Sequence, residues 1–335
     1  MTYRSILAAL ILSFCFASYG QARRVKIKLA TMAPKGSAFY ETLKKMGDEW
    51  RTASDGKVRL KIYPGGVAGG DRDVIRKMKL GTVNAGMVTA AGLAAVHKAV
   101  HVFQMPATFK SPAELDYLVE KMGKTVADIY EAQGLMVLSW GEAGWVRFLS
   151  KTPMMDPKDR AEQKMYIIAG NPAQVTLWQT AGFNVVPLPV SEISTGLQTG
   201  LITAVPVTAQ SALMFQWYKH APHMMSYAWA PLMGAIVVDK RVWEKIDPTL
   251  RPQLRAIAEA SGKALLGQVR PGEMKALAAM QTRGLQLNET PPELVTAWQN
   301  LATVAKPSLR GAYVPVELFD QAQTLLEAFR SNPTP

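Results

Sequence analysis

Strand-like and helix-like segments alternate along the first part of the chain. Val25 to Ala33 alternates lysine with apolar residues, which predicts a strand, and Phe39 to Trp50 places apolar residues at helical spacing. A strand followed by a helix is predicted again, with the strand at Val58 to Tyr63 and the helix at Asp71 to Leu80. Ala85 to Val88 then predicts a short buried strand. This alternation predicts an α/β fold with a mainly parallel sheet.

A second unit of the same kind begins near Lys151. Before it, Ser111 to Gln133 predicts a long amphipathic helix and Leu135 to Trp140 an apolar strand. After it come predicted strands at Lys164–Ile168, Asn184–Val186, Ala204–Val207 and Gly234–Asp239, and helices at Pro172–Ala181 and Ser191–Thr199. From Asp247-Pro248 onward the chain is predicted helical, with a kink or break at Pro271-Gly272. The length of 335 residues suits about two domains.

The first 22 residues have the pattern of a secretory signal peptide. Arg4 precedes the apolar run Ile6 to Phe16, and Gly20-Gln21-Ala22 is a small-x-small cleavage pattern. We expect cleavage after Ala22 and export to a bacterial periplasm. Cys15, the only cysteine, could instead mark a lipoprotein anchor, but Phe14 before it is too bulky for a usual lipobox.

The chain carries a formal charge of +12, from 38 Lys and Arg against 26 Asp and Glu. A surplus of this size favours an anionic membrane surface or an acidic protein partner. The basic residues are scattered, with no run longer than two, and export argues against nucleic acid.

Motifs of common enzymes and metal sites are missing from the sequence. It has no GxSxG, HExxH or GxxxxGK[ST], and the pairs His97/His101 and His220/His223 have no nearby carboxylate cluster. The glycine-rich segment Gly65 to Gly70 lacks the Lys and Ser/Thr of a phosphate loop and predicts a backbone turn at a cleft mouth. We therefore expect no enzyme, no catalytic residue, no metal site and no cofactor.

Several short blocks follow one another in a fixed order from about Val25 to the C-terminus. They are Tyr63–Gly66, Gly69–Arg72, Leu80–Thr82, Gly144–Arg147 with Pro153, Lys164–Tyr166, Ala181–Asn184, Val186–Glu192, Leu197–Gly200 and Lys240–Trp243. Their order and spacing together resemble the solute-binding proteins of TRAP transporters (DctP-type). No single block is specific to that family.

The resemblance implies a two-lobed periplasmic binding protein fold, with a central cleft between two α/β domains that close on a ligand, and with C-terminal helices. It also implies a monomer that delivers its ligand to a TRAP-type integral membrane permease. We expect lobes that are discontinuous in sequence: residues 23–150 with about 233–270 form domain I, and 151–232 with about 271–330 form domain II. The chain would pass from domain I into domain II near Ser150 and return to domain I near Met233.

This sequence departs from the family pattern at ligand-facing positions. Tyr166 stands where the family has an arginine that pairs with a substrate carboxylate. A neutral phenol therefore replaces a permanently charged guanidinium at this position. Val207 stands at the position of a ligand-binding asparagine, and Val190 at that of an aromatic residue. Thr89 occupies a usually polar position, and Arg147 alone remains of the paired arginines.

These departures predict an apolar cleft. We expect its lining to include Met87, Thr89, Trp145, Tyr166, Val190, Val205 and Val207, with Arg147 holding any acidic head group. Such walls favour a hydrophobic or amphipathic ligand, namely a lipid, fatty acid or isoprenoid. Three alternatives stay open: a small organic acid bound through Arg147, a lipid shuttle or scaffold that works without a TRAP permease, and an Arg147 that serves only a structural ion pair.

Overall fold

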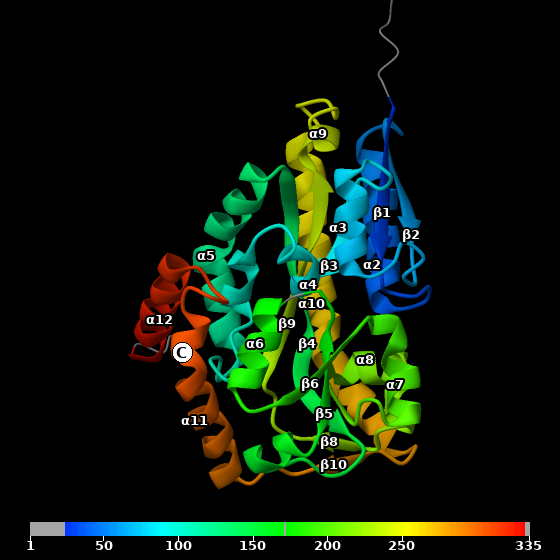
Figure 1. Cartoon of the computed structure of the whole chain (residues 1–335). Coiled ribbons are helices and arrows are strands. Elements are labelled where there is room, and N and C mark those ends of the chain that lie inside the picture. Colours follow the sequence, from blue (N-terminus) through cyan, green and yellow to red (C-terminus); the bar gives the residue numbers. More distant parts are fainter. Residues whose placement is uncertain (1–23, 171, 332–335) are drawn as a thin grey trace, which may run out of the picture.

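A single mixed sheet organises the chain in the computed structural model, which describes residues 24–170 and 172–331 (Figure 1). The predicted signal peptide, with its cut after Ala22, lies outside the described residues. The ten strands include a main path in the order β2-β1-β3-β9-β4-β7-β5-β6, and β8 and β10 pair beside it. Their bounds are β1 Val25–Thr31, β2 Val58–Tyr63, β3 Ala85–Thr89, β4 Leu135–Ser150, β5 Lys164–Ile168, β6 Asn184–Leu188, β7 Ala204–Thr208, β8 His223–Met225, β9 Ala230–Asp239 and β10 Gln286–Asn288.

Helices cover this sheet. The longer ones are α2 Ala38–Ala53, α3 Asp71–Lys79, α5 Pro112–Ala132, α6 Pro172–Thr180, α10 Arg251–Gln281, α11 Pro292–Leu309 and α12 Val316–Ser331. The shorter ones are α4 Ala90–Leu93, α7 Ile193–Thr199, α8 Ala209–Met214 and α9 Lys240–Trp243, with 3-10 turns at Lys98–Phe103, Pro157–Ala161, Val190–Glu192 and Trp217–Lys219. Among the described residues, no helix is both long and apolar enough to cross a membrane.

The sheet is mixed, so the expectation of a mainly parallel sheet is only half right. β1 pairs in parallel with β2 and β3, and β5 pairs in parallel with β6 and β7. The central strands run the other way, because β9 is antiparallel to both β3 and β4, and β4 is antiparallel to β7. A buried strand reads as a continuous apolar run in either direction, so the hydrophobic pattern alone does not reveal its direction.

Strand β4 links the two halves of the sheet. It was predicted to end at Trp140, but it continues to Ser150. Its first part pairs with β9, and its last residues, from Val146, pair with β7. The register of the β4–β9 pair shifts between Glu142 and Trp145, and Gly144 there has a φ of 107°. An irregularity of this kind bends a strand and re-aims the side chains that follow it.

Four clusters of buried apolar side chains form the core, two in each half of the sheet. One cluster in the first half joins α3 and α5 to Leu318 and Leu326 of α12. The predicted boundaries assign α12 to domain II, although α12 packs on helices of the first half of the sheet. The division into two domains stays a prediction.

Helix α10 is continuous across Pro271, where the sequence predicts a kink or a break. The helix packs along its length against α2, β4 and α8, and these contacts hold it together across the proline. Gly262 allows the closest approach, since a Cβ on it would lie 1.9 Å from Oγ of Ser139 on β4.

Candidate functional site

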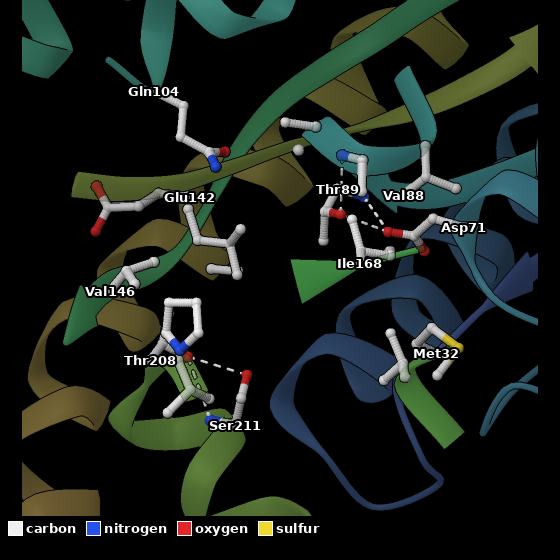
Figure 2. Close-up of a pocket in the computed structure, with 18 of the residues that line it drawn as sticks. Met32, Asp71, Val88, Thr89, Gln104, Glu142, Val146, Ile168, Thr208 and Ser211 are labelled. Carbon is white, nitrogen blue, oxygen red and sulfur yellow. Dashed lines mark hydrogen bonds between the residues drawn. The ribbon is translucent and has the colours of Figure 1, made fainter. Parts of the chain in front are cut away.

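A cavity of about 340 Å³ lies where the two halves of the sheet face each other (Figure 2). The last residues of four parallel-paired strands line it: Thr31 of β1, Thr89 of β3, Ile168 of β5 and Thr208 of β7. Open α/β sheets bind ligands in the crevice outside the carboxyl ends of their strands. The volume also lies in the range of small-molecule sites. Both facts make this cavity the candidate ligand site.

Six of the eight predicted site residues line this cavity. They are Met87, Thr89, Tyr166, Val190, Val205 and Val207. They come from both halves of the chain, as the resemblance implies for a cleft between lobes. Whether they contact a ligand stays a prediction.

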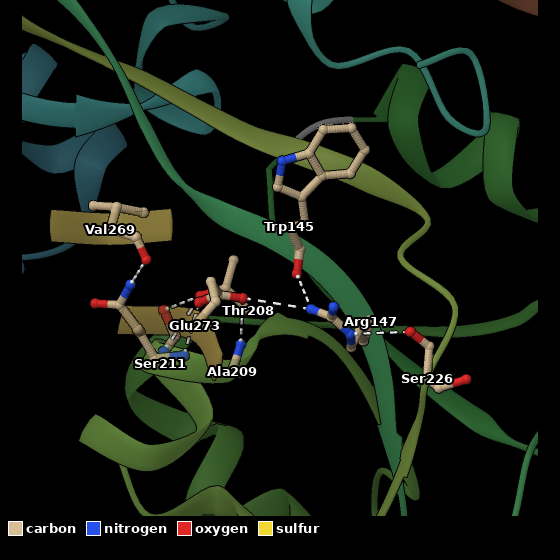
Figure 3. Close-up of polar contacts among 9 residues, drawn as sticks. Trp145, Arg147, Thr208, Ala209, Ser211, Ser226, Val269 and Glu273 are labelled. Atoms are coloured by element: carbon tan, nitrogen blue, oxygen red, sulfur yellow. Dashed lines mark hydrogen bonds and ion pairs between the residues drawn. The ribbon is translucent and has the colours of Figure 1, made fainter. Parts of the chain in front are cut away.

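Arg147 and Trp145 are not among the described residues that line the cavity. The Arg147 guanidinium contacts Glu273 of α10 at 3.5 Å and donates to the carbonyl oxygens of Ser226 (3.2 Å) and Trp145 (3.3 Å) (Figure 3). Trp145 packs its ring against the core cluster of the first half. The guanidinium is thus directed to Glu273 and two carbonyl oxygens, and a ligand contact of Arg147 stays a prediction. The structural ion pair, left open above, is what the geometry shows.

Glu273 also caps helix α8. Its carboxylate accepts hydrogen bonds from the backbone N–H groups of Ala209 (3.2 Å) and Gln210 (3.0 Å), while the Gln210 side chain donates to the carbonyl oxygen of Val269. Burial raises the pKa of Glu273, and the two backbone donors and Arg147 oppose that rise. Gly144 must lack a side chain here, since a Cβ on it would lie 2.6 Å from the carboxylate. The pair thus joins β4, α8 and α10.

Several polar side chains of the cavity wall are already bonded to protein groups. Asp71 Oδ2 accepts from both the backbone N–H (2.8 Å) and the hydroxyl (2.5 Å) of Thr89, as Figure 2 shows. The hydroxyls of Thr208 and Ser211 are paired at 3.0 Å. Glu142 accepts from Arg270, which lies outside the lining. Asp71, Thr89, Thr208 and Ser211 therefore already have hydrogen-bond partners within the wall.

Four buried polar atoms of the wall have no hydrogen-bond partner among the described residues. They are the hydroxyl of Tyr166, Nε1 of Trp229, Nδ1 of His101 and Oε1 of Glu142. A buried polar group left unpaired costs about 1–3 kcal/mol. Burial, with Asp71 nearby, raises the pKa of Tyr166, so its hydroxyl keeps its proton and can donate it to a ligand.

Arg72 is the one Lys or Arg among the described residues that line the cavity. It follows Asp71 in the first turn of α3, and its guanidinium forms no salt bridge or hydrogen bond with the described residues. The guanidinium lies beside the loop after β5, since a Cβ on Gly170 would be 3.4 Å from Nε of Arg72. In the sequence, Arg72 ends the block Gly69–Arg72, and no role is predicted for it.

His101 is buried: it is 4% exposed and stacks on Tyr313 with ring centroids 3.8 Å apart. His97 does cap the following turn, since its Nδ1 accepts from the N–H of Ala99. His220 and His223 lie beside Gln198 and Asn288. The described residues hold no group of three or more potential metal ligands.

The burial of His101 predicts a loss of stability in acid. Burial, with Lys98 nearby, lowers the pKa of His101 to about 3, whereas an unfolded histidine titrates near 6.5. Below pH 6.5 the unfolded chain therefore binds a proton that the folded chain does not, so stability present above pH 6.5 falls as the pH falls toward 3. We expect a slope of up to about 1.4 kcal/mol per pH unit from this group. Urea unfolding of a His101→Phe variant between pH 7 and 4 checks this: the variant should lose less stability than the wild type, and an equal loss would contradict it.

The family model for "Bacterial extracellular solute-binding protein, family 7" (DctP) matches residues 29–308. The chain belongs to this family. Family 7 proteins are solute-binding proteins rather than enzymes, and those of TRAP systems deliver small-molecule ligands to a TRAP membrane permease.

Two curated relatives of this family 7 protein are named as periplasmic binding proteins. The C4-dicarboxylate-binding protein DctP of Rhodobacter capsulatus is 27% identical over 90% of this chain and 93% of its own length. The 2,3-diketo-L-gulonate-binding protein YiaO of Escherichia coli is 23% identical over 73% of this chain and 75% of its own length.

Solved structures share the fold. A sugar-acid-binding protein of Advenella mimigardefordensis, bound to galactonate, has a TM-score of 0.85 at 18% identity and covers 91% of this chain and 99% of its own. A TRAP binding protein of Ralstonia eutropha H16, bound to (S)-2-acetolactate, has a TM-score of 0.82 at 17% identity and covers 90% and 99%. This chain therefore has the two-lobed fold of TRAP solute-binding proteins. The ligands that these names give are small organic acids.

Proposed function

We propose that this family 7 protein captures a small organic acid in the 340 Å³ cavity and delivers it to a TRAP permease. The observation that carries the proposal is that Arg72 and the hydroxyl of Tyr166 lie in the same cavity wall, each without a partner among the residues that the structure describes. Binding of organic acids by similar proteins supports the class of ligand.

The carboxylate of this ligand would bind Arg72 and not Arg147. Arg147 already contacts Glu273 and two carbonyl oxygens, so a ligand would have to break buried contacts to reach it. Arg72 has no such partner among the described residues, and a guanidinium offers paired donors that fit a carboxylate. The Tyr166 hydroxyl would supply a further donor.

The rest of the ligand would be mainly apolar. Val190, Val205 and Val207 line the cavity from the same half of the sheet as Tyr166. Met87 and Val88 of β3 line it from the other half. A sugar acid would bring several hydroxyls against such walls, and each hydroxyl left without a partner costs about 1–3 kcal/mol. A monocarboxylic acid with a branched or aromatic body and few hydroxyls fits these walls best.

Substitutions of the two proposed contacts test this function. We expect Arg72→Gln to weaken binding of an acid such as 2-hydroxy-4-methylpentanoate by tenfold or more, since a hydrogen bond to a charged group contributes about 1.5–3 kcal/mol. Tyr166→Phe should weaken it less, because its neutral bond contributes about 0.5–1.5 kcal/mol. Titration calorimetry on ligand-free protein measures both.

Arg76→Gln is the matched control. Arg76 lies one turn further along α3, pairs with Asp73 at 3.0 Å and is not among the lining residues. Affinity should not change in this variant. Equal affinity of Arg72→Gln and Arg76→Gln for the acid would overturn the assignment of Arg72.

The lipid ligand remains a second candidate, because the same apolar walls suit a fatty acid or an isoprenoid. Palmitate in the same titrations decides: binding of palmitate that is tighter than that of the small acids and indifferent to Arg72→Gln would favour the lipid. A shuttle or scaffold role without a permease, and docking of the basic surface on an anionic membrane or acidic partner, stay predictions.

A further inference from the structure

A second, smaller cavity lies beside the ligand cavity, with a volume of about 30 Å³. Helices α6 and α11 and the segments next to them enclose it, and Ala181, Phe183, Leu301 and Ala302 are among its lining residues. All the residues that line it are apolar or aromatic. A site of this size holds about one water-sized group, but water there would find almost no hydrogen-bond partner.

Four residues line both cavities and so form the partition between them: Pro106, Leu177, Trp178 and Trp229. The rings of Trp178 and Trp229 are 6.5 Å apart at an angle of 42°, so they are not stacked on each other. The partition is therefore one layer of side chains thick.

The two tryptophans are held differently. Trp229 is 6% exposed, and its ring packs against those of Phe148 and Trp298, which are fully buried. Trp178 is only half-buried and lies near the end of the nine-residue helix α6, although its ring also contacts those of Phe183 (4.7 Å) and Phe148 (6.1 Å). Because Trp178 is the more exposed of the two, its side chain is the one we expect to move when the partition opens.

We propose that the smaller cavity is a subsite for the apolar end of the ligand and sets the preferred ligand length. The proposal rests on the proposed function, since it takes the carboxylate to be at Arg72 and the apolar body to point away from it. The occupant is a terminal alkyl group of about the size of one methyl or methylene, which fits a volume of about 30 Å³ and enters when the Trp178 side chain moves aside.

Titration calorimetry with unbranched 2-oxo acids of increasing length tests the subsite. Each methylene that becomes buried should tighten binding by about fourfold, from about 0.8 kcal/mol per group. Affinity should rise until the subsite is filled and then level off. The Ala302→Leu variant fills the subsite from α11, so we expect it to lose this rise while it binds the shortest acids as the wild type does.

Ala181→Val provides a second, smaller filling from the opposite wall, in case Ala302→Leu disturbs the core. The control is Val304→Leu, on the same helix and 79% exposed, which should keep the wild-type length profile. Retained binding of short acids shows that each variant is folded.

If both filled variants keep the wild-type rise in affinity with length, the subsite assignment is wrong. It is also wrong if wild-type affinity for these acids does not change with length, and in that case the proposed function stands. A wild type that binds no 2-oxo acid and no 2-hydroxy acid of any length would overturn both.

Discussion

Replacing Arg147 with methionine is expected to lower the free energy of unfolding by about 3–5 kcal/mol, because the change leaves one partner of a buried ion pair without its counterion. The side chains of Arg147 and Glu273 are 14% and 8% exposed, so water does little to screen the charge that remains. Glu273 also caps α8, so the loss of the ion pair weakens the contacts among β4, α8 and α10. Urea unfolding of the two proteins at neutral pH gives the difference.

Two controls separate this structural role from a ligand role. The double variant Arg147→Met with Glu273→Gln should recover part of the stability, since it removes the uncompensated carboxylate. Arg72→Met should leave stability nearly unchanged, because the Arg72 guanidinium has no partner to lose among the described residues. If Arg147→Met unfolds like the wild type but no longer binds acids, Arg147 is a ligand contact after all.

Replacing Trp298 with alanine is expected to cost about 3–5 kcal/mol of unfolding free energy, as large-to-small changes in a core do. Trp298 is fully buried, and its ring lies 5.3 Å from that of Phe148 and 5.4 Å from that of Trp229. Its indole N–H donates to the carbonyl oxygen of Met155 at 2.7 Å. The side chain thus attaches α11 to the second half of the sheet.

Trp298→Phe separates the contribution of ring packing from that of the hydrogen bond to Met155, because it keeps an aromatic ring and removes the indole N–H. We expect a smaller loss, of about 1–3 kcal/mol, from the unpaired carbonyl of Met155. Val304→Ala, on the exposed side of the same helix, should change stability by less than about 0.5 kcal/mol. Equal stabilities of Trp298→Ala and Val304→Ala would show that α11 does not pack as described.

Local elements were largely predictable from the sequence. The strand Lys164–Ile168 has the predicted bounds, and the predicted long helix runs from Pro112 to Ala132 with Ser111 as its N-cap. The direction and full length of β4 were not predictable, because apolar runs carry no direction and the continuation past Trp140 contains two glycines.

The cavity wall was predictable by position, but the partners of its charged groups were not. Six of the predicted residues lie on the wall, and their contact with a ligand stays a prediction. The contact of Arg147 with Glu273 was not predictable, because Glu273 lies 126 residues further along the chain. Strand β4 is also irregular just before Arg147. Arg72 and His101 were missed because their roles follow from burial and unpaired atoms, which only the folded chain has.

The ligand that the protein carries when purified natively from its host tests the central claim most directly. Mass spectrometry of the extracted ligand should find a small carboxylic acid with few hydroxyl groups in the wild type, retained in Arg76→Gln and largely lost from Arg72→Gln. A fatty acid or isoprenoid in its place, or equal amounts of the acid in Arg72→Gln and the wild type, would contradict a small-acid site built on Arg72.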